Sequence, residues 1–214
     1  MPNKLPPYTF KRQDVSVQEN DVIWKHPKGV FSVYGIQFQQ PVFGLDDHYS
    51  LRRVIMDKPS CVVALPYDPR LDSVVIIEQI RPTKVFSGAD SPCMYEFCAG
   101  LIDSGETAEI AMRRELQEEC ALHAQRLEMI GTYWVSPGWT TERLTMYCVE
   151  VDASKPVDAC GNASECETTR VSVLPFQQLM DALDAGEIDN GGFLIGALWL
   201  ARHRDRLRGD WNHK

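Results

Sequence analysis

Three glutamates in the middle of the chain have the spacing of a ligand set. Glu118 and Glu119 follow Glu115 by three and four residues, so on a helix all three side chains project from one face. Like charges at this spacing repel each other, and Arg114 is the one adjacent cation on that helix turn. Carboxylate oxygens in this number suit Mg²⁺ or Mn²⁺ rather than zinc or copper. A solvated acidic helix face is the alternative, but it does not explain the residues that precede these glutamates.

The glutamates belong to a longer pattern. Gly100 is followed after five residues by Glu106, and after seven more by Arg114-Glu115-Leu116. The segment from Gly100 to Leu122 resembles the Nudix box, G-x5-E-x7-R-E-U-x-E-E-x-G-U, at every fixed position but one. The exception is Ala121, where the family usually has a glycine that ends the helix in a left-handed conformation. Alanine in that conformation should cost about 1 kcal/mol and removes no ligand.

The resemblance implies a metal-dependent hydrolase with two to three Mg²⁺ ions per site, Mn²⁺ being an alternative. In this pattern Gly100, Glu106 and Arg114 are structural parts of the box. The implied metal ligands are the backbone carbonyl of Ala99 and the carboxylates of Glu115, Glu118 and Glu119.

Segments outside the box resemble the bacterial ADP-ribose pyrophosphatase branch of the family. They are Leu65-Pro66-Tyr67-Asp68-Pro69, 77–81, 136–143 and Gly186-Glu187-Ile188-Asp189-Asn190. The implied reaction is Mg²⁺-dependent hydrolysis of the diphosphate bond of ADP-ribose to AMP and ribose 5-phosphate. Another nucleoside diphosphate sugar, such as a UDP-hexose or GDP-mannose, is an alternative because the metal helix does not distinguish base or sugar. A non-catalytic nucleotide sensor of the same fold is a third possibility, against which the retained box glutamates count.

A polar segment, residues 152–169, lacks periodicity and predicts a long loop, and long loops in compact domains are often functional. Glu165-Cys166-Glu167 within it resembles the loop that supplies a catalytic glutamate and a metal ligand in this branch. The resemblance therefore implies Glu165 as general base and Glu167 as an additional ligand. A solvated pair of acidic side chains is the alternative.

The resemblance also implies substrate contacts. Arg53 and Arg81 match substrate-contacting arginines, and a guanidinium can bind phosphate through two hydrogen bonds or stack on a purine. Surface ion pairing is the alternative for these two residues and for Arg52. Val30 and Phe31 match positions that touch the adenine across a dimer interface, although Val30 is not aromatic. The remaining implied contacts are Leu101, Ser136, Pro137, Gly138 and Glu142.

Hydrophobic periodicity predicts the elements that position these residues. Residues 1–58 alternate polar and apolar side chains, as in 30–38, which predicts an N-terminal antiparallel sheet. Residues 59–214 form the second expected domain. Its predicted strands are 61–65, 74–79, 94–98, 127–135, 144–151 and 170–174, and its predicted helices are 107–122, 176–185 and 192–206. This order predicts an α/β sandwich. The resemblance implies an α/β/α sandwich of mixed sheets around the Nudix helix and a homodimer that involves the N-terminal sheet.

Composition limits the partners and the compartment. The chain has 214 residues, of which 44% are hydrophobic and 24% charged, as in ordinary globular proteins. A net charge of −8 argues against nucleic acid but not against a phosphorylated small molecule, because bound cations supply positive charge. Seven cysteines without a C-x-x-C pair indicate reduced thiols and a cytoplasmic location. No apolar run is long enough for a signal peptide or a membrane span, so no membrane association is expected.

Overall fold

The computed structural model describes residues 5–212, which form two compact units. The first unit contains the described residues up to Pro59 together with Trp134–Glu142, and the second contains Ser60–Tyr133 and the chain from Arg143 onward. The sequence did not associate Trp134–Glu142 with the N-terminal strands. Backbone hydrogen bonds make this association, because Met56 N–H donates to the carbonyl of Trp139 at 2.7 Å and Thr141 N–H donates to the carbonyl of Met56 at 3.0 Å.

The first unit is a three-stranded antiparallel sheet, as the alternating pattern predicted. Its order is β1 (Ser16–Lys25), β2 (Ser32–Pro41) and β3 (His48–Asp57), preceded by the short 3-10 helix η1 (Arg12–Asp14). Of the residues described in this unit, Gly35 and Thr140 alone are buried. The sheet therefore has no hydrophobic core of its own.

The second unit is built on an eight-stranded mixed sheet. Strands β10-β11-β5-β4-β9-β8 form its main path, with β6 beside β5 and β7 beside β4. Strand β4 pairs with β9 in parallel, whereas β5 pairs with β11 antiparallel. The strands are β4 (Cys61–Asp68), β5 (Ser73–Ile80), β6 (Cys93–Glu96), β7 (Cys98–Leu101), β8 (Leu127–Trp134), β9 (Arg143–Glu150), β10 (Ala159–Cys160) and β11 (Thr169–Pro175).

The hairpin of β4 and β5 separates soon after its turn. The two strands pair at only two positions, Tyr67 with Val74 and Asp68 with Ser73. Beyond them β7 pairs with the start of β4 and β6 pairs with the end of β5. The single strand predicted at 94–98 was therefore wrong: this segment forms two strands with different partners, divided by the buried residue Phe97.

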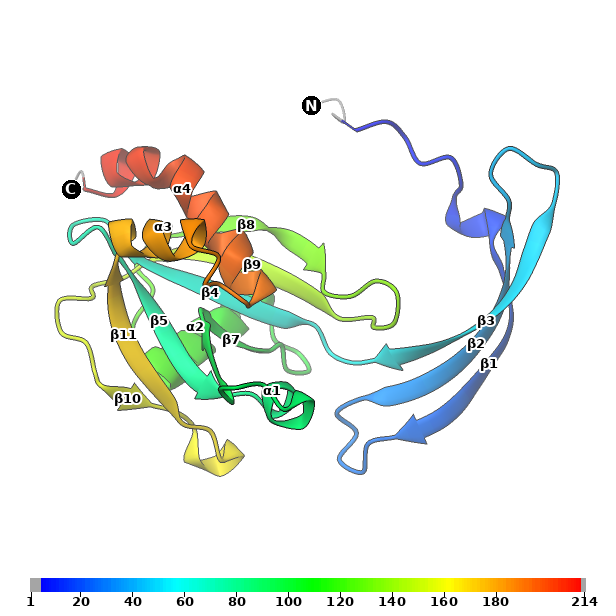
Figure 1. Ribbon diagram of the computed structural model, residues 1–214, viewed down its shortest axis with the longest axis horizontal. Coiled ribbons are helices and arrows are strands. Elements are labelled where there is room, and N and C mark those ends of the chain that lie inside the picture. Colours follow the sequence, from blue (N-terminus) through cyan, green and yellow to red (C-terminus); the bar gives the residue numbers. More distant parts are fainter. Residues whose placement is uncertain (1–4, 213–214) are drawn as a thin grey trace. The chain divides into compact units, whose positions relative to one another are not determined.

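Helices cover both faces of this sheet (Figure 1). Helix α2 (Ala108–Cys120) packs on one face, and α3 (Phe176–Asp184) and α4 (Gly191–Asn212) pack on the other. Along β4, Val62 and Ala64 belong to the core beneath α2, whereas Val63 and Leu65 belong to the core beneath α3 and α4. This alternation with both faces buried confirms the predicted α/β sandwich.

Three boundaries differ from the sequence prediction. Helix α4 continues to Asn212 because its last turns are buried at Leu207 and Trp211. Helix α1 (Pro82–Ser87) was not predicted, since six residues are too few to display periodicity. The predicted loop 152–169 contains β10 and the 3-10 helix η2 (Ala163–Glu165). Within residues 5–212, no helix has the length and apolar character needed to cross a membrane.

Candidate active site

Helix α2 carries the predicted glutamates and has well-defined ends. Thr107 caps its start, because its hydroxyl oxygen accepts a hydrogen bond from Ile110 N–H at 3.3 Å. At its end Ala121 adopts φ 53° and ψ 33°, the left-handed conformation that the family glycine would supply. Leu122 N–H then donates to the carbonyl of Leu116 at 3.3 Å. The helix therefore ends at Ala121 with the same backbone geometry that a glycine would give.

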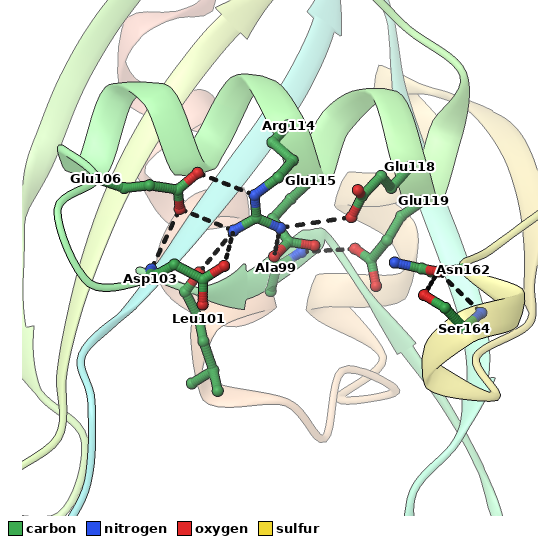
Figure 2. Close-up of polar contacts among 10 residues, drawn as sticks. All are labelled: Ala99, Leu101, Asp103, Glu106, Arg114, Glu115, Glu118, Glu119, Asn162 and Ser164. Carbon is green, nitrogen blue, oxygen red and sulfur yellow. Dashed lines mark hydrogen bonds and ion pairs between the residues drawn. The ribbon is translucent and has the colours of Figure 1, made fainter. Parts of the chain in front are cut away.

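Arg114 connects the start of the box to its glutamates (Figure 2). Its Nε and Nη2 donate to the two carboxylate oxygens of Glu106 at 3.1 and 3.0 Å, and Nη2 also donates to the carbonyl of Leu101 at 3.0 Å. Its Nη1 lies 2.7 Å from Glu115 Oε1 and 3.4 Å from Glu118 Oε2. One guanidinium thus fixes the loop before the helix against the turn that carries the acidic side chains.

Strand β7 lies against two of these acidic side chains. A Cβ atom at Gly100 would lie 1.8 Å from Glu115 Oε1, so only glycine leaves room for that carboxylate. The neighbouring Ala99 N–H donates to Glu119 Oε2 at 2.8 Å. The structure therefore brings together Ala99, Gly100, Glu115 and Glu119, as the sequence predicted.

The two carboxylates are poorly solvated. Glu115 is 8% exposed and Glu119 is 3% exposed. Burial raises the pKa of Glu119 to about 7; the hydrogen bond from Ala99 N–H opposes this shift, and the charges of Glu115 and Glu167 add to it. Burial also raises the pKa of Glu115, against the effect of Arg114. Glu167 therefore lies within electrostatic range of both helix carboxylates.

The loop that carries Glu167 is fastened to the last turn of α2. Gly161 N–H donates to the carbonyl of Glu118 at 3.1 Å, and Thr169 Oγ1 donates to the carbonyl of Glu119 at 2.9 Å. These bonds satisfy carbonyls that have no partner inside the helix. Gly161 has φ 136°, and a Cβ there would lie 2.3 Å from the carbonyl oxygen of Glu167. Neither anchor was predicted from the sequence, although an isolated glycine in a polar loop was a usable signal.

Glu165 and Glu167 flank a tight turn in this loop. Glu165 is the last residue of η2, and Cys166 after it adopts a left-handed φ of 58°. The side chain of Asn162 caps η2 by accepting hydrogen bonds from the backbone and hydroxyl of Ser164 at 3.1 and 2.6 Å (Figure 2).

An open cleft of about 690 Å³ lies beside this loop. Its lining includes Gln79, Arg81, Glu167, Thr168 and Arg170. Arg81 forms an ion pair with the buried Glu96, with Nε 2.9 Å from Oε1. The predicted substrate arginine is thus held at a cleft that it shares with a predicted metal ligand.

The other predicted substrate residues are distributed between the units. Leu101 belongs to the second unit, where its carbonyl accepts from Arg114. The others belong to the first unit: Val30, Phe31, Arg53, Ser136, Pro137, Gly138 and Glu142.

Several of the first-unit residues have local partners. Phe31 packs against Trp24 and His26 with ring centroids 5.2 and 5.3 Å away, and Val30 is exposed. Arg53 Nη1 donates to the carbonyl of Arg52, and Glu142 pairs with Lys58 at 2.7 Å. Arg52 pairs with Asp21 at 2.9 Å on the surface, which is the surface ion pairing expected as the alternative for this residue.

The donor chemistry at α2 fits a hard divalent cation. All the candidate ligands are oxygens, at least two are buried acids, and Gly100 leaves room for the carboxylate of Glu115. Among the described residues, no group of three or more His, Cys, Asp or Glu side chains is already arranged to hold a metal ion. The exact ligand set is therefore part of the proposal below.

A mixed sheet between helices, with a glycine-backed helix that presents buried carboxylates, is the architecture expected of a metal-assisted hydrolase. Residues 57–194 match the family model described as NUDIX domain, and the chain belongs to this family. It is a Nudix hydrolase.

Three relatives illustrate where in the family the chain lies. It is 34% identical over 210 residues to the ADP-ribose pyrophosphatase of Escherichia coli (strain K12), covering 98% of each chain. It is 29% identical to the ADP-ribose pyrophosphatase of Haemophilus influenzae, covering 94% of this chain and 93% of the relative. A GDP-mannose pyrophosphatase of Escherichia coli O1:K1 is 31% identical over 140 residues, covering 65% of this chain and 72% of the relative.

The left-handed alanine gives a stability prediction. Replacing Ala121 with glycine should raise the free energy of unfolding by about 1 kcal/mol, because glycine adopts this conformation without strain. Urea denaturation measures the change. The matched control is Ala201→Gly in the exposed, right-handed interior of α4, which should lower the free energy of unfolding by about 1 kcal/mol. A loss of stability in Ala121→Gly would contradict this account of the helix ending.

Proposed function

We propose that the protein hydrolyses the diphosphate bond of ADP-ribose to AMP and ribose 5-phosphate with Mg²⁺. The observation that carries the proposal is the similarity to the Escherichia coli ADP-ribose pyrophosphatase, which covers 98% of both chains. That similarity includes nearly all of the first unit as well as the Nudix domain. The substrate is then a small nucleoside diphosphate sugar, and neither nucleic acid nor a membrane is part of the proposal.

GDP-mannose is the second candidate substrate, because a GDP-mannose pyrophosphatase matches 65% of the chain. The chemistry at α2 acts on the diphosphate and is the same for either sugar nucleotide. A UDP-hexose is a further alternative for the same reason. A non-catalytic sensor is disfavoured because Glu115, Glu118 and Glu119 are all retained.

A substrate panel tests the choice. The protein is incubated with Mg²⁺ and ADP-ribose, GDP-mannose or a UDP-hexose, and the released phosphomonoesters are measured after treatment with a phosphatase. We expect ADP-ribose to have the highest kcat/KM and to yield AMP. A higher kcat/KM for GDP-mannose would replace ADP-ribose with the second candidate, and binding without any product would favour the sensor.

The proposed ligands are the carboxylates of Glu115, Glu119 and Glu167 and the carbonyl of Ala99, with Glu118 as a further carboxylate. Bound Mg²⁺ would neutralise the non-bridging phosphate oxygens and lower the pKa of a coordinated water. Mn²⁺ would serve the same role. Arg114 keeps Glu115 oriented through its 2.7 Å contact, and the anchors at Gly161 and Thr169 hold the loop of Glu167 next to the helix.

Glu165 is the proposed general base, which accepts a proton from the attacking water. Its support is its position, because it lies two residues before Glu167 in the loop that is fastened to α2. A carboxylate at this place can act on a water while Glu167 serves as a ligand. Arg81, Arg53 and the contacts at Val30, Phe31, Leu101, Ser136, Pro137, Gly138 and Glu142 are proposed to bind the substrate.

Replacing Glu165 with glutamine should lower kcat by about 100-fold or more, because the amide cannot accept the proton. Mg²⁺ binding measured by calorimetry should change little. The matched control is Glu109→Gln on the exposed side of α2, where Glu109 pairs with Arg113 at 3.0 Å; its turnover should equal that of the wild type. Near-normal kcat in Glu165→Gln would rule out Glu165 as the base.

A homodimer involving the first unit is also proposed. Support comes from the coreless sheet, which exposes apolar side chains including Val22, Trp24 and Val54. Covering these exposed apolar side chains would stabilise the sheet, and a second copy of this chain can cover them. Light scattering at micromolar concentration should give twice the 24.3 kDa chain mass. A monomer mass would contradict the dimer.

A cytoplasmic location completes the proposal. Its support is that thiols persist in a reducing compartment, and the structure has free thiols at Cys93, Cys98, Cys120, Cys148, Cys160 and Cys166.

A further inference from the structure

Glu96 is a buried carboxylate that has no place in the Nudix box. It ends strand β6 and is 4% exposed. Its oxygens accept hydrogen bonds from Gln79 Nε2 at 3.0 Å, from Arg81 Nε at 2.9 and 3.1 Å, and from Asn190 Nδ2 at 3.0 Å. A buried charge with this many donors is well compensated and holds each donor in a fixed position.

Asn190 connects this cluster to helix α4. Its Oδ1 accepts a hydrogen bond from Phe193 N–H at 2.8 Å, which caps the start of the helix. The preceding residue, Asp189, pairs with Lys84 of α1 at 2.8 Å. The segment 186–190, which resembles the ADP-ribose branch, therefore contacts both Glu96 and the helix that directly follows Arg81.

The hydrogen bonds to Glu96 hold the guanidinium of Arg81 in place although its side chain is partly exposed. Its side chain is 34% exposed at the cleft it shares with Glu167. Glu96 binds the edge formed by Nε and Nη2, and Nη1 lies on the other edge of the guanidinium. Without Glu96, the guanidinium would turn toward the carboxylate of Glu167, which lines the same cleft.

We propose that Glu96 is a positioning residue for Arg81 and that Asn190 supports it, so that together they set the affinity for the diphosphate substrate. The inference rests on the proposed function, in which Arg81 binds the substrate. A guanidinium held on one edge is preorganised to donate from the other edge to a phosphate oxygen, so less conformational entropy is lost on binding. The same clamp keeps Arg81 away from the carboxylates proposed to bind metal.

A double-mutant cycle tests the coupling. Arg81→Ala, Glu96→Gln and the double variant are compared with the wild type, by steady-state kinetics with ADP-ribose and Mg²⁺. We expect Glu96→Gln to raise KM about tenfold and to change kcat less than about threefold. The reason is that Arg81, without its charged partner, no longer holds the position from which it donates to a phosphate oxygen. In the Arg81→Ala background, the same substitution should leave KM unchanged.

Asn190→Ser provides a second variant if Glu96→Gln folds poorly. Serine retains the helix cap, so thermal unfolding should change little, but it cannot donate an amide hydrogen bond to Glu96. KM should rise about threefold, and this rise should also vanish in the Arg81→Ala background.

The inference would be overturned if Glu96→Gln and Asn190→Ser each raised KM by the same factor in the wild type and in the Arg81→Ala background. Such a result would show that Glu96 and Asn190 have a general structural role. Failure of the proposed function would appear separately, as a wild-type protein that does not hydrolyse ADP-ribose. The cycle would then be measured with the sugar nucleotide that the substrate panel identifies.

Discussion

The carboxylates of Glu115 and Glu119 lie buried against strand β7. Their neighbours in the second unit must therefore make room for both groups and satisfy their hydrogen bonds. Gly100 leaves space for Glu115, and the backbone N–H of Ala99 holds Glu119. Arg114 compensates part of the charge but also binds Glu106, so it cannot move freely between partners. Burying two acids carries a desolvation cost, which the proposed cation would relieve, so the packing of α2 on β7 and that binding would be energetically linked.

The separation of β4 from β5 places the contacts to Arg81 and to Glu119 on one short segment of chain. Because β4 and β5 separate after two residue pairs, residues 93–101 fill the space between them. Phe97 marks the bend and packs edge-on against Phe193 at 4.6 Å. Glu96, on one side of the bend, holds Arg81, and Ala99, on the other side, holds Glu119. One short segment thus contacts both Arg81 and the acidic helix.

Local features of the site could be predicted from the sequence, and long-range ones could not. The helix, its glutamates and the ending at Ala121 follow from spacing within 23 residues of chain, because a helix converts spacing directly into a shared face. Glu96 could not be found in this way, since its partners Gln79 and Asn190 are 17 and 94 residues away. Periodicity indicated a strand near 94–98 but does not specify which strand is its neighbour. The anchors of the loop escaped notice because they bind main-chain carbonyls, which every residue possesses.

The loop that carries Glu167 is attached to α2 through main-chain carbonyls, and the side chains of that helix turn supply the acidic groups. Gly161 and Thr169 bind the carbonyls of Glu118 and Glu119 and do not contact their carboxylates. The attachment of the loop therefore runs through the main chain at these two helix positions and not through their side chains. The last turn of α2 thus holds the loop with its main chain and presents acidic side chains to the site.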